Sequence, residues 1–493
     1  MDLDVVRSVA LELSGLDRRV GMWLSALAGL TVGVIAFSML YPIRFPGMDF
    51  QAFWCAGSVF LQHANPYLNQ PLHACEAAHS PAFFAAYPNV TIPVPLPPYA
   101  IAILAPISLI PFTAARALWW FVLAVAAFAM GRGISQVTGM PPITSVAVSF
   151  LAVLGPAIFP GALAPIPVAI TVFAALAVKR GQWNRGAILL GLAMIEPHMV
   201  LPACAAAFAF VPQMRLRLTA VAVTAGALTI AAVGPHVALS YFTTMLPTHA
   251  LAEVNNLAQY SLTAVLYRLG VAPELAVRIG SVQYAALVIG GIFIAGRLYR
   301  NTQDRSWLIL VPAAFAVVGG AFIHLDQVAM VVPLACLIVR ARPSKLATAV
   351  LVMLAVPGEI LINWLPFAIP GALVCGWLVA QTKAHWKVVV VSSIAVVAVA
   401  AGMLALLITG THFTAPAIRV ADPGPQASAS VAWGEFTSFA AVRPRIWWTE
   451  KLLTMLPLLT LLAITLGEAF RPKRSTQLPG GARRAGVLSR APS

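Results

Sequence analysis

Long apolar runs recur along almost the whole chain and are separated by short polar gaps. The runs are rich in Ala, Val and Leu and are bounded by Arg, Lys, Pro and Gly. Many of them approach the roughly 20 residues that an α-helix needs to cross a bilayer. Strands of a membrane barrel would be shorter and would alternate polar with apolar residues. The pattern therefore predicts an all-α polytopic membrane protein.

Basic residues gather in the gaps between the apolar runs and predict how the chain is oriented. Since Lys and Arg are enriched in cytoplasmic loops, we place these clusters on the cytoplasmic side. An even number of crossings must then lie between successive clusters, which gives about 12–14 transmembrane helices. The clusters are Arg18-Arg19, Arg132, Lys179-Arg180 with Arg185, Arg215 to Arg217, Arg297 to Arg305, Arg340 to Lys345, Lys383 to Lys387 and the tail from Arg471.

From Arg132 onward the apolar runs satisfy this condition in pairs. They are 143–158 with 162–178, two short runs around Pro197, 217–236 with 275–297, 306–323 with 325–340, 346–362 with 364–381, and 387–409 with 448–470.

The segment between the first outer loop and Arg132 conflicts with this rule. It holds two apolar runs, 94–111 and 113–132, where only one crossing is allowed. Either the first run is a half-membrane or interfacial helix, or Arg132 is extracytoplasmic. The prolines between Pro93 and Tyr99 favour a bent, partial segment, because proline removes a backbone donor and distorts a helix start.

The predicted topology divides the chain into three parts. Residues 1–20 form a cytoplasmic N-terminus, with Arg18 and Arg19 before a signal anchor, and residues 21–470 form one transmembrane domain. Residues 471–493 form a basic, disordered cytoplasmic tail that faces lipid headgroups. The long loops are extracytoplasmic, and we expect the chemistry there because functional residues gather on loops held by a rigid scaffold. These loops are 43–93, 237–262 and 410–447.

Composition supports a multi-pass protein of the inner (plasma) membrane. The chain has 493 residues, of which 60% are hydrophobic and 10% charged, which lies outside the range of soluble globular domains. The net charge of +15 follows from the positive-inside pattern. The aromatic-interleaved basic patches of a nucleic-acid surface are absent from the sequence, so we expect membrane lipids and no nucleic acid as partners.

The five cysteines predict no metal site. Cys204, Cys336 and Cys375 lie in apolar runs, where cysteine is usually a small inert hydrophobe. Cys55 and Cys75 lie in the first polar loop and could pair if that loop faces an oxidising compartment, or could stay free. No zinc-ligand spacing is present, and we expect no metal and no cofactor.

Asp49 is an acid within the aromatic stretch "GMDFQAFWCAG", just after the first apolar run. The apolar residues of 50–62 recur at helical spacing, which predicts an amphipathic helix at the membrane interface. Asp49 would stand at its N-cap position, where an acid stabilises a helix. The same carboxylate could instead accept a proton from a hydroxyl nucleophile.

Two longer stretches resemble glycosyltransferase family 87. "GMDFQAFWCAGSVFLQHANPYLN" is similar to the first-loop signature of that family, with Asp49, the Ala56-Gly57 pair and the turn Asn65-Pro66-Tyr67 in the matching positions. "PLPPYAIAILAPISLIPFTAARALW" is similar to the Pro-Pro segment and Leu-Trp helix that follow it. The resemblance extends over roughly Asp49 to Leu334.

This resemblance implies a bundle of the GT-C class and a membrane glycosyltransferase. Such an enzyme takes a sugar, here expected to be mannose, from a polyprenyl-phosphate donor on the extracytoplasmic side. The acceptor would be a lipid-linked or envelope glycan. Asp49 would be the general base that deprotonates the acceptor hydroxyl. A metal is not required, since Arg, His or helix N-termini can stabilise the leaving phosphate.

Glu196 and His198 flank a proline in the apolar stretch "IEPHMVLP". Ionisable groups at membrane depth usually face a cavity or a partner. The family often has Lys-Pro here, so Glu196 reverses the local charge and is assigned to the sugar or acceptor. His198 could hydrogen-bond the donor phosphate, or the pair could be a polar bend at the membrane surface.

His324 and Asp326 lie at an outer turn in "FIHLDQVAMVVPL". In the family a comparable His lies near the donor phosphate, to which an imidazole can donate. Asp326 could fix the tautomer of the ring or contact the sugar. The alternative is a helix cap with an interfacial His.

The loop "EVNNLAQYSLTAVLYRLG" carries a dense polar set before an amphipathic segment. Amides and hydroxyls of this kind bind sugar hydroxyls, so we expect sugar or acceptor contacts from Asn256, Gln259 and Ser261, together with Tyr67 of the first loop. Arg268 could bind the donor phosphate, because a guanidinium binds phosphate bidentately. An ordinary solvated loop is the alternative.

Two other functions fit the sequence less well. A transporter or flippase of a lipid-linked sugar would predict repeat symmetry and broken helices near the midplane, whereas the ionisable groups here lie at the outer boundary. An inactive structural subunit of an envelope-synthesis complex would explain two departures from the family: Glu196, and "PGALAPIP" (Pro160 to Pro167) in place of a Gly-Gln turn.

Overall fold

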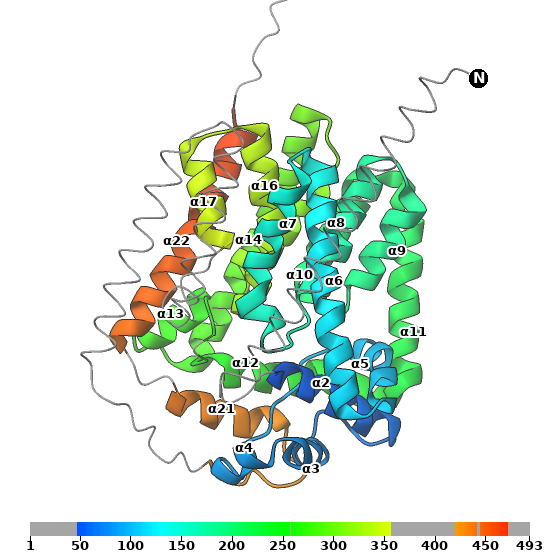
Figure 1. Cartoon of the computed structure of the whole chain (residues 1–493), viewed down its shortest axis with the longest axis vertical. Coiled ribbons are helices and arrows are strands. Elements are labelled where there is room, and N and C mark those ends of the chain that lie inside the picture. Colours follow the sequence, from blue (N-terminus) through cyan, green and yellow to red (C-terminus); the bar gives the residue numbers. More distant parts are fainter. Residues whose placement is uncertain (1–46, 257, 356–419, 441–443, 472–493) are drawn as a thin grey trace, which may run out of the picture.

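The computed structural model describes residues 47–256, 258–355, 420–440 and 444–471 (Figure 1). Regular structure within these ranges is helical, which confirms the predicted all-α fold. In the part of the chain that the structure describes, four helical stretches are long and apolar enough to cross a membrane: Phe112–Thr138, Pro212–Glu253, Pro273–Thr302 and Lys451–Ala469. Shorter apolar helices lie among them. The total of about 12–14 crossings and the three-part division stay predictions, because 1–46, 356–419 and 472–493 lie outside the described residues.

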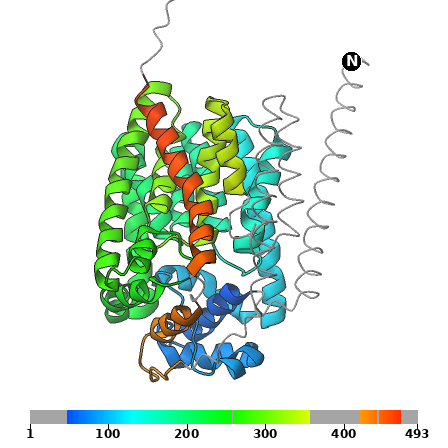
Figure 2. The ribbon, with the colours of Figure 1, turned by 90° about the vertical axis from the view of Figure 1, so that its left-hand side faces the viewer.

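The bundle consists of long and short helices, several of which begin where the sequence places proline. Proline opens several of them, since a helix start has no partner for the N–H that proline lacks. The bundle helices are α6 (Phe112–Thr138), α7 (Pro142–Val153), α8 (Pro165–Lys179), α9 (Trp183–Ala193), α10 (Pro197–Phe210), α11 (Arg215–Ser240), α14 (Pro273–Thr302), α15 (Trp307–Val318), α16 (Val332–Ala341), α17 (Lys345–Ala355) and α22 (Pro444–Ala469). In Figure 2, α22 runs along one side of this bundle.

The centre of the bundle is α15, every residue of which is buried. It packs against α8, α10 and α14. Close approach to α14 depends on Gly291, where a Cβ atom would lie 2.7 Å from Cβ of Phe315. A helix that is apolar all round is stable only when neighbours cover all its faces, so α15 forms the rigid core of the scaffold.

Short helices gather at one end of the bundle, the lower end in Figure 1. They come from three separate parts of the sequence, which the fold joins directly. Leu68 and Ser428 form an isolated β-bridge, and Asn69 N–H donates to the Ala427 carbonyl at 2.8 Å. The short helices are α2 (Met48–Leu61), α3 (Asn69–His79), α4 (Pro81–Ala86), α5 (Pro98–Leu104), α12 (Leu246–Glu253), α13 (Leu262–Arg268) and α21 (Ala429–Ala440). The described parts of the three long loops therefore meet at one end.

Basic residues mark the opposite end. The Lys179 ammonium pairs with Asp304 at 2.8 Å, and the Arg342 guanidinium pairs with Glu468 at 2.8 Å. The two ends thus differ, one carrying basic clusters and the other the loop helices. That the loop-helix end is extracytoplasmic stays a prediction from the positive-inside rule.

The segment 94–111 does not form a long helix. It folds as α5 and a short 3₁₀ turn, η1 (Ala105–Leu109), and both pack on α2. At 1.5 Å per residue α5 spans only about 10 Å, too little to cross the hydrocarbon core. This geometry favours the interfacial alternative for this segment, so that of the two runs 94–111 and 113–132 only the second forms a crossing.

Candidate active site

Asp49 lies in the first turn of α2, and the turn that follows α7 fixes its position. The N-cap is Gly47 (φ 81°), so the expectation that Asp49 itself caps the helix is wrong by two residues. The reason is that backbone carbonyls satisfy the helix start: Gly47 N–H donates to Phe159 O at 3.1 Å, and Asp49 N–H donates to Pro160 O at 2.9 Å. The carboxylate of Asp49 is therefore not used as a cap.

The same turn packs tightly against α2 through Gly161. This residue has φ +79°, and a Cβ atom on it would lie 2.8 Å from Cβ of Phe50. Its carbonyl accepts a hydrogen bond from the Trp119 indole at 2.8 Å. A π-helical turn, η2 (Leu154–Ile158), leads into it. The stretch "PGALAPIP", which departs from the family pattern, thus holds the start of the helix that carries Asp49.

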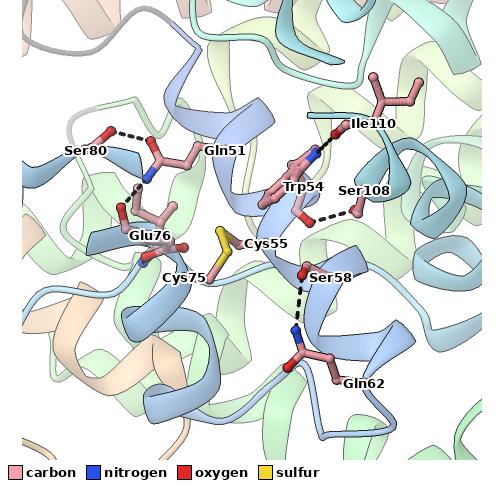
Figure 3. Close-up of a disulfide and its surroundings, with 11 residues drawn as sticks. Gln51, Trp54, Cys55, Ser58, Gln62, Cys75, Glu76, Ser80, Ser108 and Ile110 are labelled. Carbon is pink, nitrogen blue, oxygen red and sulfur yellow. Dashed lines mark hydrogen bonds between the residues drawn. A yellow bond between two sulfur atoms is a disulfide. The ribbon is translucent and has the colours of Figure 1, made fainter. Parts of the chain in front are cut away.

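A disulfide ties α2 to α3 (Figure 3). Cys55 and Cys75 are bonded, with their Cα atoms 5.7 Å apart, so the paired alternative holds. Beside it, the Gln51 amide donates to the Glu76 carbonyl at 2.7 Å and accepts from the Ser80 hydroxyl at 2.5 Å. On the other side of α2, the Ser108 hydroxyl donates to the carbonyl of Trp54 at 2.7 Å. The helix that carries Asp49 is therefore fixed on two sides.

Four carboxylates interact at this end of the bundle, and the pKa is raised in three of them. Asp49 is half-buried, and burial together with the charges of Asp326 and Glu253 raises its pKa to about 8. Glu196, only 6% exposed, has its pKa raised well above the usual range by burial and by the charges of Asp326 and Asp49. Burial also raises the pKa of Asp326. At neutral pH Asp49 therefore holds a proton that an isolated carboxyl group would lose.

Polar atoms without partners mark the same cluster. Among the described residues, no hydrogen bond or ion pair is made by the Asp49 carboxylate, and Oε2 of Glu196 is buried without a hydrogen bond. Native proteins leave few buried polar atoms unpaired, so such atoms commonly indicate a functional role or a bound partner. The structure thus brings together the two predicted acids from the first loop and the "IEPHMVLP" stretch.

His324 lies where the second outer loop pairs with the turn after α15. Gln259 and His324 form an isolated β-bridge, and Tyr260 N–H donates to Ile323 O at 2.8 Å. Side chains meet as well: Nε2 of Gln259 lies 2.8 Å from Nε2 of His324. Two residues predicted from separate parts of the sequence, Gln259 and His324, are thus in direct contact.

His198 joins this region through the side chain of Gln327, with which its ring interacts. Gln327 also accepts a hydrogen bond from the His324 backbone N–H, at 3.2 Å. His198 follows Pro197 at the start of α10, so it lies two residues after Glu196 in the chain. Both histidines expected to contact a donor phosphate are therefore linked to one turn.

Glu253, at the end of α12, is a residue that sequence analysis missed. It is 2% exposed, and its two carboxylate oxygens accept hydrogen bonds from Trp433 Nε1 (2.6 Å), Asn256 Nδ2 (2.7 Å) and Gln259 Nε2 (3.1 Å). Its Oε2 lies 3.4 Å from His324 Nε2. The available signal was an acid directly before the polar set "NNLAQYS" in an outer loop.

Other predicted residues use their side chains within the protein. The Tyr67 hydroxyl donates to the Leu96 carbonyl at 2.8 Å, and the Ser261 hydroxyl accepts from Ala264 N–H at 3.3 Å as the N-cap of α13. Asn256 bonds Glu253 and, through Oδ1, Ala258 N–H. Arg268 lies half-buried on α13, and the hydrogen bonds that join Gln259, Glu253 and His324 do not include it. In the described part of the chain, no group of three or more His, Cys, Asp or Glu residues could hold a metal ion.

A buried lysine lies close to the same loop. Lys451, at the start of the apolar part of α22, is 1% exposed, and its Nζ lies 4.0 Å from the ring centroid of Tyr260. A cation over an aromatic face is stabilised by the ring quadrupole. Sequence reasoning had no signal for this contact, because it joins positions nearly 200 residues apart.

Comparison with known proteins gives a family match for the central part of the chain. The sequence model of glycosyltransferase family 87 matches residues 96–323, which hold Glu196, His198, Gln259 and the other second-loop residues but neither Asp49 nor His324. The comparisons with curated proteins and with solved structures each gave no match. The matching model is that of a glycosyltransferase, an enzyme that uses a sugar donor and an acceptor. Residues 96–323 therefore form a glycosyltransferase family 87 domain.

Proposed function

We propose that the protein transfers a sugar from a polyprenyl-phosphate donor to a hydroxyl acceptor at the extracytoplasmic boundary of the plasma membrane, with Asp49 as the general base. The single observation that carries the proposal is the Asp49 carboxylate: it has no hydrogen-bond or ion-pair partner among the described residues, while its backbone is fixed by Pro160. A carboxylate held in this way is available to accept a proton.

The reaction balances with the groups present. The acceptor oxygen forms a bond to the anomeric carbon, the bond from that carbon to the phosphate oxygen breaks, and the acceptor proton passes to Asp49. The polyprenyl phosphate leaves with the electron pair. His324, His198 and Arg268 are the donors we assign to this phosphate, since imidazole and guanidinium N–H groups stabilise developing negative charge.

The sugar and acceptor subsite is assigned to the polar residues around the base. Glu196 offers an unpaired buried oxygen, and Asp326 interacts with it. A hydroxyl of the sugar or acceptor would satisfy that oxygen. Gln259, Asn256, Ser261 and Tyr67 shape the neighbouring loop through the hydrogen bonds described above. Mannose as the sugar, and a lipid-linked or envelope glycan as the acceptor, follow from the family resemblance.

The test is sugar transfer by purified protein in proteoliposomes, with radiolabelled polyprenyl-phosphate mannose and a membrane extract as acceptor source. Asp49→Asn removes the base with little change in shape, and we expect transfer to fall by about 10²–10⁴-fold, the usual contribution of a general base. The matched control is Glu274→Gln, an exposed acid in the first turn of α14, which should keep the wild-type rate.

Transfer by Asp49→Asn at the wild-type rate would remove the base assignment. Movement of intact donor across the bilayer without formation of glycosylated product would instead favour the transporter alternative.

A further inference from the structure

The stretch "IEPHMVLP" ends in a second proline, Pro202, which lies inside helix α10. In a regular α-helix the N–H of residue 202 would donate to the carbonyl of His198, four residues earlier. Proline has no N–H, and its ring presses against that same carbonyl. The carbonyl of His198 therefore lacks the donor that the helix would normally give it from residue 202.

A tyrosine of another helix supplies a donor to this carbonyl. The Tyr284 hydroxyl, on α14, donates to the His198 carbonyl at 2.7 Å, and the two helices pack against each other. A backbone carbonyl without a donor is costly away from water. The hydrogen bond therefore fixes the first turn of α10 relative to α14.

The other side of the same turn is held in the same way. The Tyr99 hydroxyl donates to the Met194 carbonyl at 2.5 Å. Tyr99 closes the "PLPPY" motif and lies in the short helix α5. Two phenols, from α5 and from α14, thus anchor the backbone on both sides of Glu196.

The anchored backbone carries a histidine ring that a ligand can reach. The His198 side chain is exposed, and its ring interacts with Gln327 in the 3₁₀ turn η5 (Leu325–Val331). Tyr284 holds the backbone of His198, whereas Gln327 meets its ring. A shift of the backbone would carry the ring away from η5.

We propose that Tyr284 is a positioning residue: its hydroxyl replaces the N–H missing at Pro202 and holds His198 where its ring meets the phosphate of the sugar donor. The role toward the phosphate rests on the function proposed above. The hydrogen bond itself does not, because both of its atoms belong to the protein.

The hydrogen bond can be read without any activity measurement. His198 is the only histidine in the sequence that is followed by methionine, so ¹³C-carbonyl histidine combined with ¹⁵N-methionine gives one coupled carbonyl signal in the full-length protein. In lipid bilayers we expect this signal to move upfield in Tyr284→Phe, which loses the donor. Adding Pro202→Ala should move it back, because residue 202 then has an N–H for the same carbonyl.

Kinetics on the same preparations test the consequence. Tyr284→Phe should raise the KM for polyprenyl-phosphate mannose by about tenfold, the effect of one lost hydrogen bond, with a smaller change in kcat. With Pro202→Ala present, the same substitution should change the KM little. The matched control is Tyr299→Phe on the same helix, since the Tyr299 hydroxyl makes no hydrogen bond among the described residues. It should keep both the carbonyl signal and the KM.

The outcomes are separable. An unmoved carbonyl signal or an unchanged donor KM in Tyr284→Phe would overturn the proposal. A KM that stayed high in the double variant would also overturn it, because the phenol would then act other than through the His198 carbonyl. If the wild-type protein transferred no sugar, the proposed function would fail, while the carbonyl signal would still decide whether Tyr284 replaces the missing N–H.

Discussion

Gly161→Ala should damage catalysis from a position that touches no substrate. The added Cβ would lie 2.8 Å from Cβ of Phe50 and 3.2 Å from its backbone nitrogen, whereas carbon atoms in contact are separated by about 3.5–4.0 Å. Relief of the clash requires a shift of about 1 Å at the start of α2. Asp49 precedes Phe50, so the carboxylate must move with it.

Two costs add to give the expected loss of stability. A non-glycine residue at φ +79° costs roughly 1–2 kcal/mol. Forcing an extra methyl group into a packed site costs about 1–3 kcal/mol. Displacement of a catalytic group by 1 Å lowers a rate by about 10²-fold. We therefore expect a lower apparent Tm and a kcat for sugar transfer reduced by about two orders of magnitude.

The assay combines thermal unfolding in detergent, followed by tryptophan fluorescence, with transfer in proteoliposomes. The matched control is Gly226→Ala on α11, where nothing lies within 4 Å of the added Cβ and the backbone is helical, so kcat should stay at the wild-type value and the Tm should not fall. If Gly161→Ala kept the wild-type Tm and kcat, the turn would not position Asp49 and the reasoning would fail.

Three further predictions concern charge, crosslinking and capping. Transfer should rise with pH through about 8, because the base must be ionised and the pKa of Asp49 is raised. Asp326→Asn removes a neighbouring negative charge, so the rising part of the kcat/KM profile should move to lower pH. An unmoved limb would show that Asp326 does not act on Asp49. Replacing Cys55 and Cys75 by Ser should cost about 3 kcal/mol, the usual effect of opening a loop of this length, measured as a lower apparent Tm that reductant reproduces in the wild-type protein. Ser261→Ala removes the cap of α13 and should cost about 1 kcal/mol with an unchanged donor KM; a raised KM would instead give its hydroxyl a role in binding.

The apolar pattern predicted the helices well because, in lipid, each apolar run must satisfy its own backbone hydrogen-bonding groups, which an α-helix does. The bounds of α11, α14 and α22 lie close to the runs 217–236, 275–297 and 448–470. The bent segment before α6 was indicated by its prolines. Whether Cys55 and Cys75 pair was not determined by spacing, because the answer depends on how α3 folds back on α2.

The site was predictable only in part. Asp49, Glu196 and His324 could be chosen individually, because ionisable residues are costly at membrane boundaries and so invite a functional explanation. Glu253 and Trp433 could not be paired from the sequence, since their contact joins loops 180 residues apart. Tyr67 and Ser261 have side chains suited to sugars, but their hydroxyl groups are engaged by nearby backbone atoms. Residue type alone does not distinguish these two uses.

The contact between α21 and Glu253 bears on how relatives of this chain could be recombined. Residues 96–323 carry the family match, yet two sets of contacts come from residues 424–433. The Trp433 indole bonds Glu253, and the carbonyls of Gly424 and Ala427 bond Asn69. A relative that received only the matched region of this chain would gain Glu253 without Trp433, the aromatic donor that bonds it. Grafts intended to change specificity should therefore transfer the two segments together.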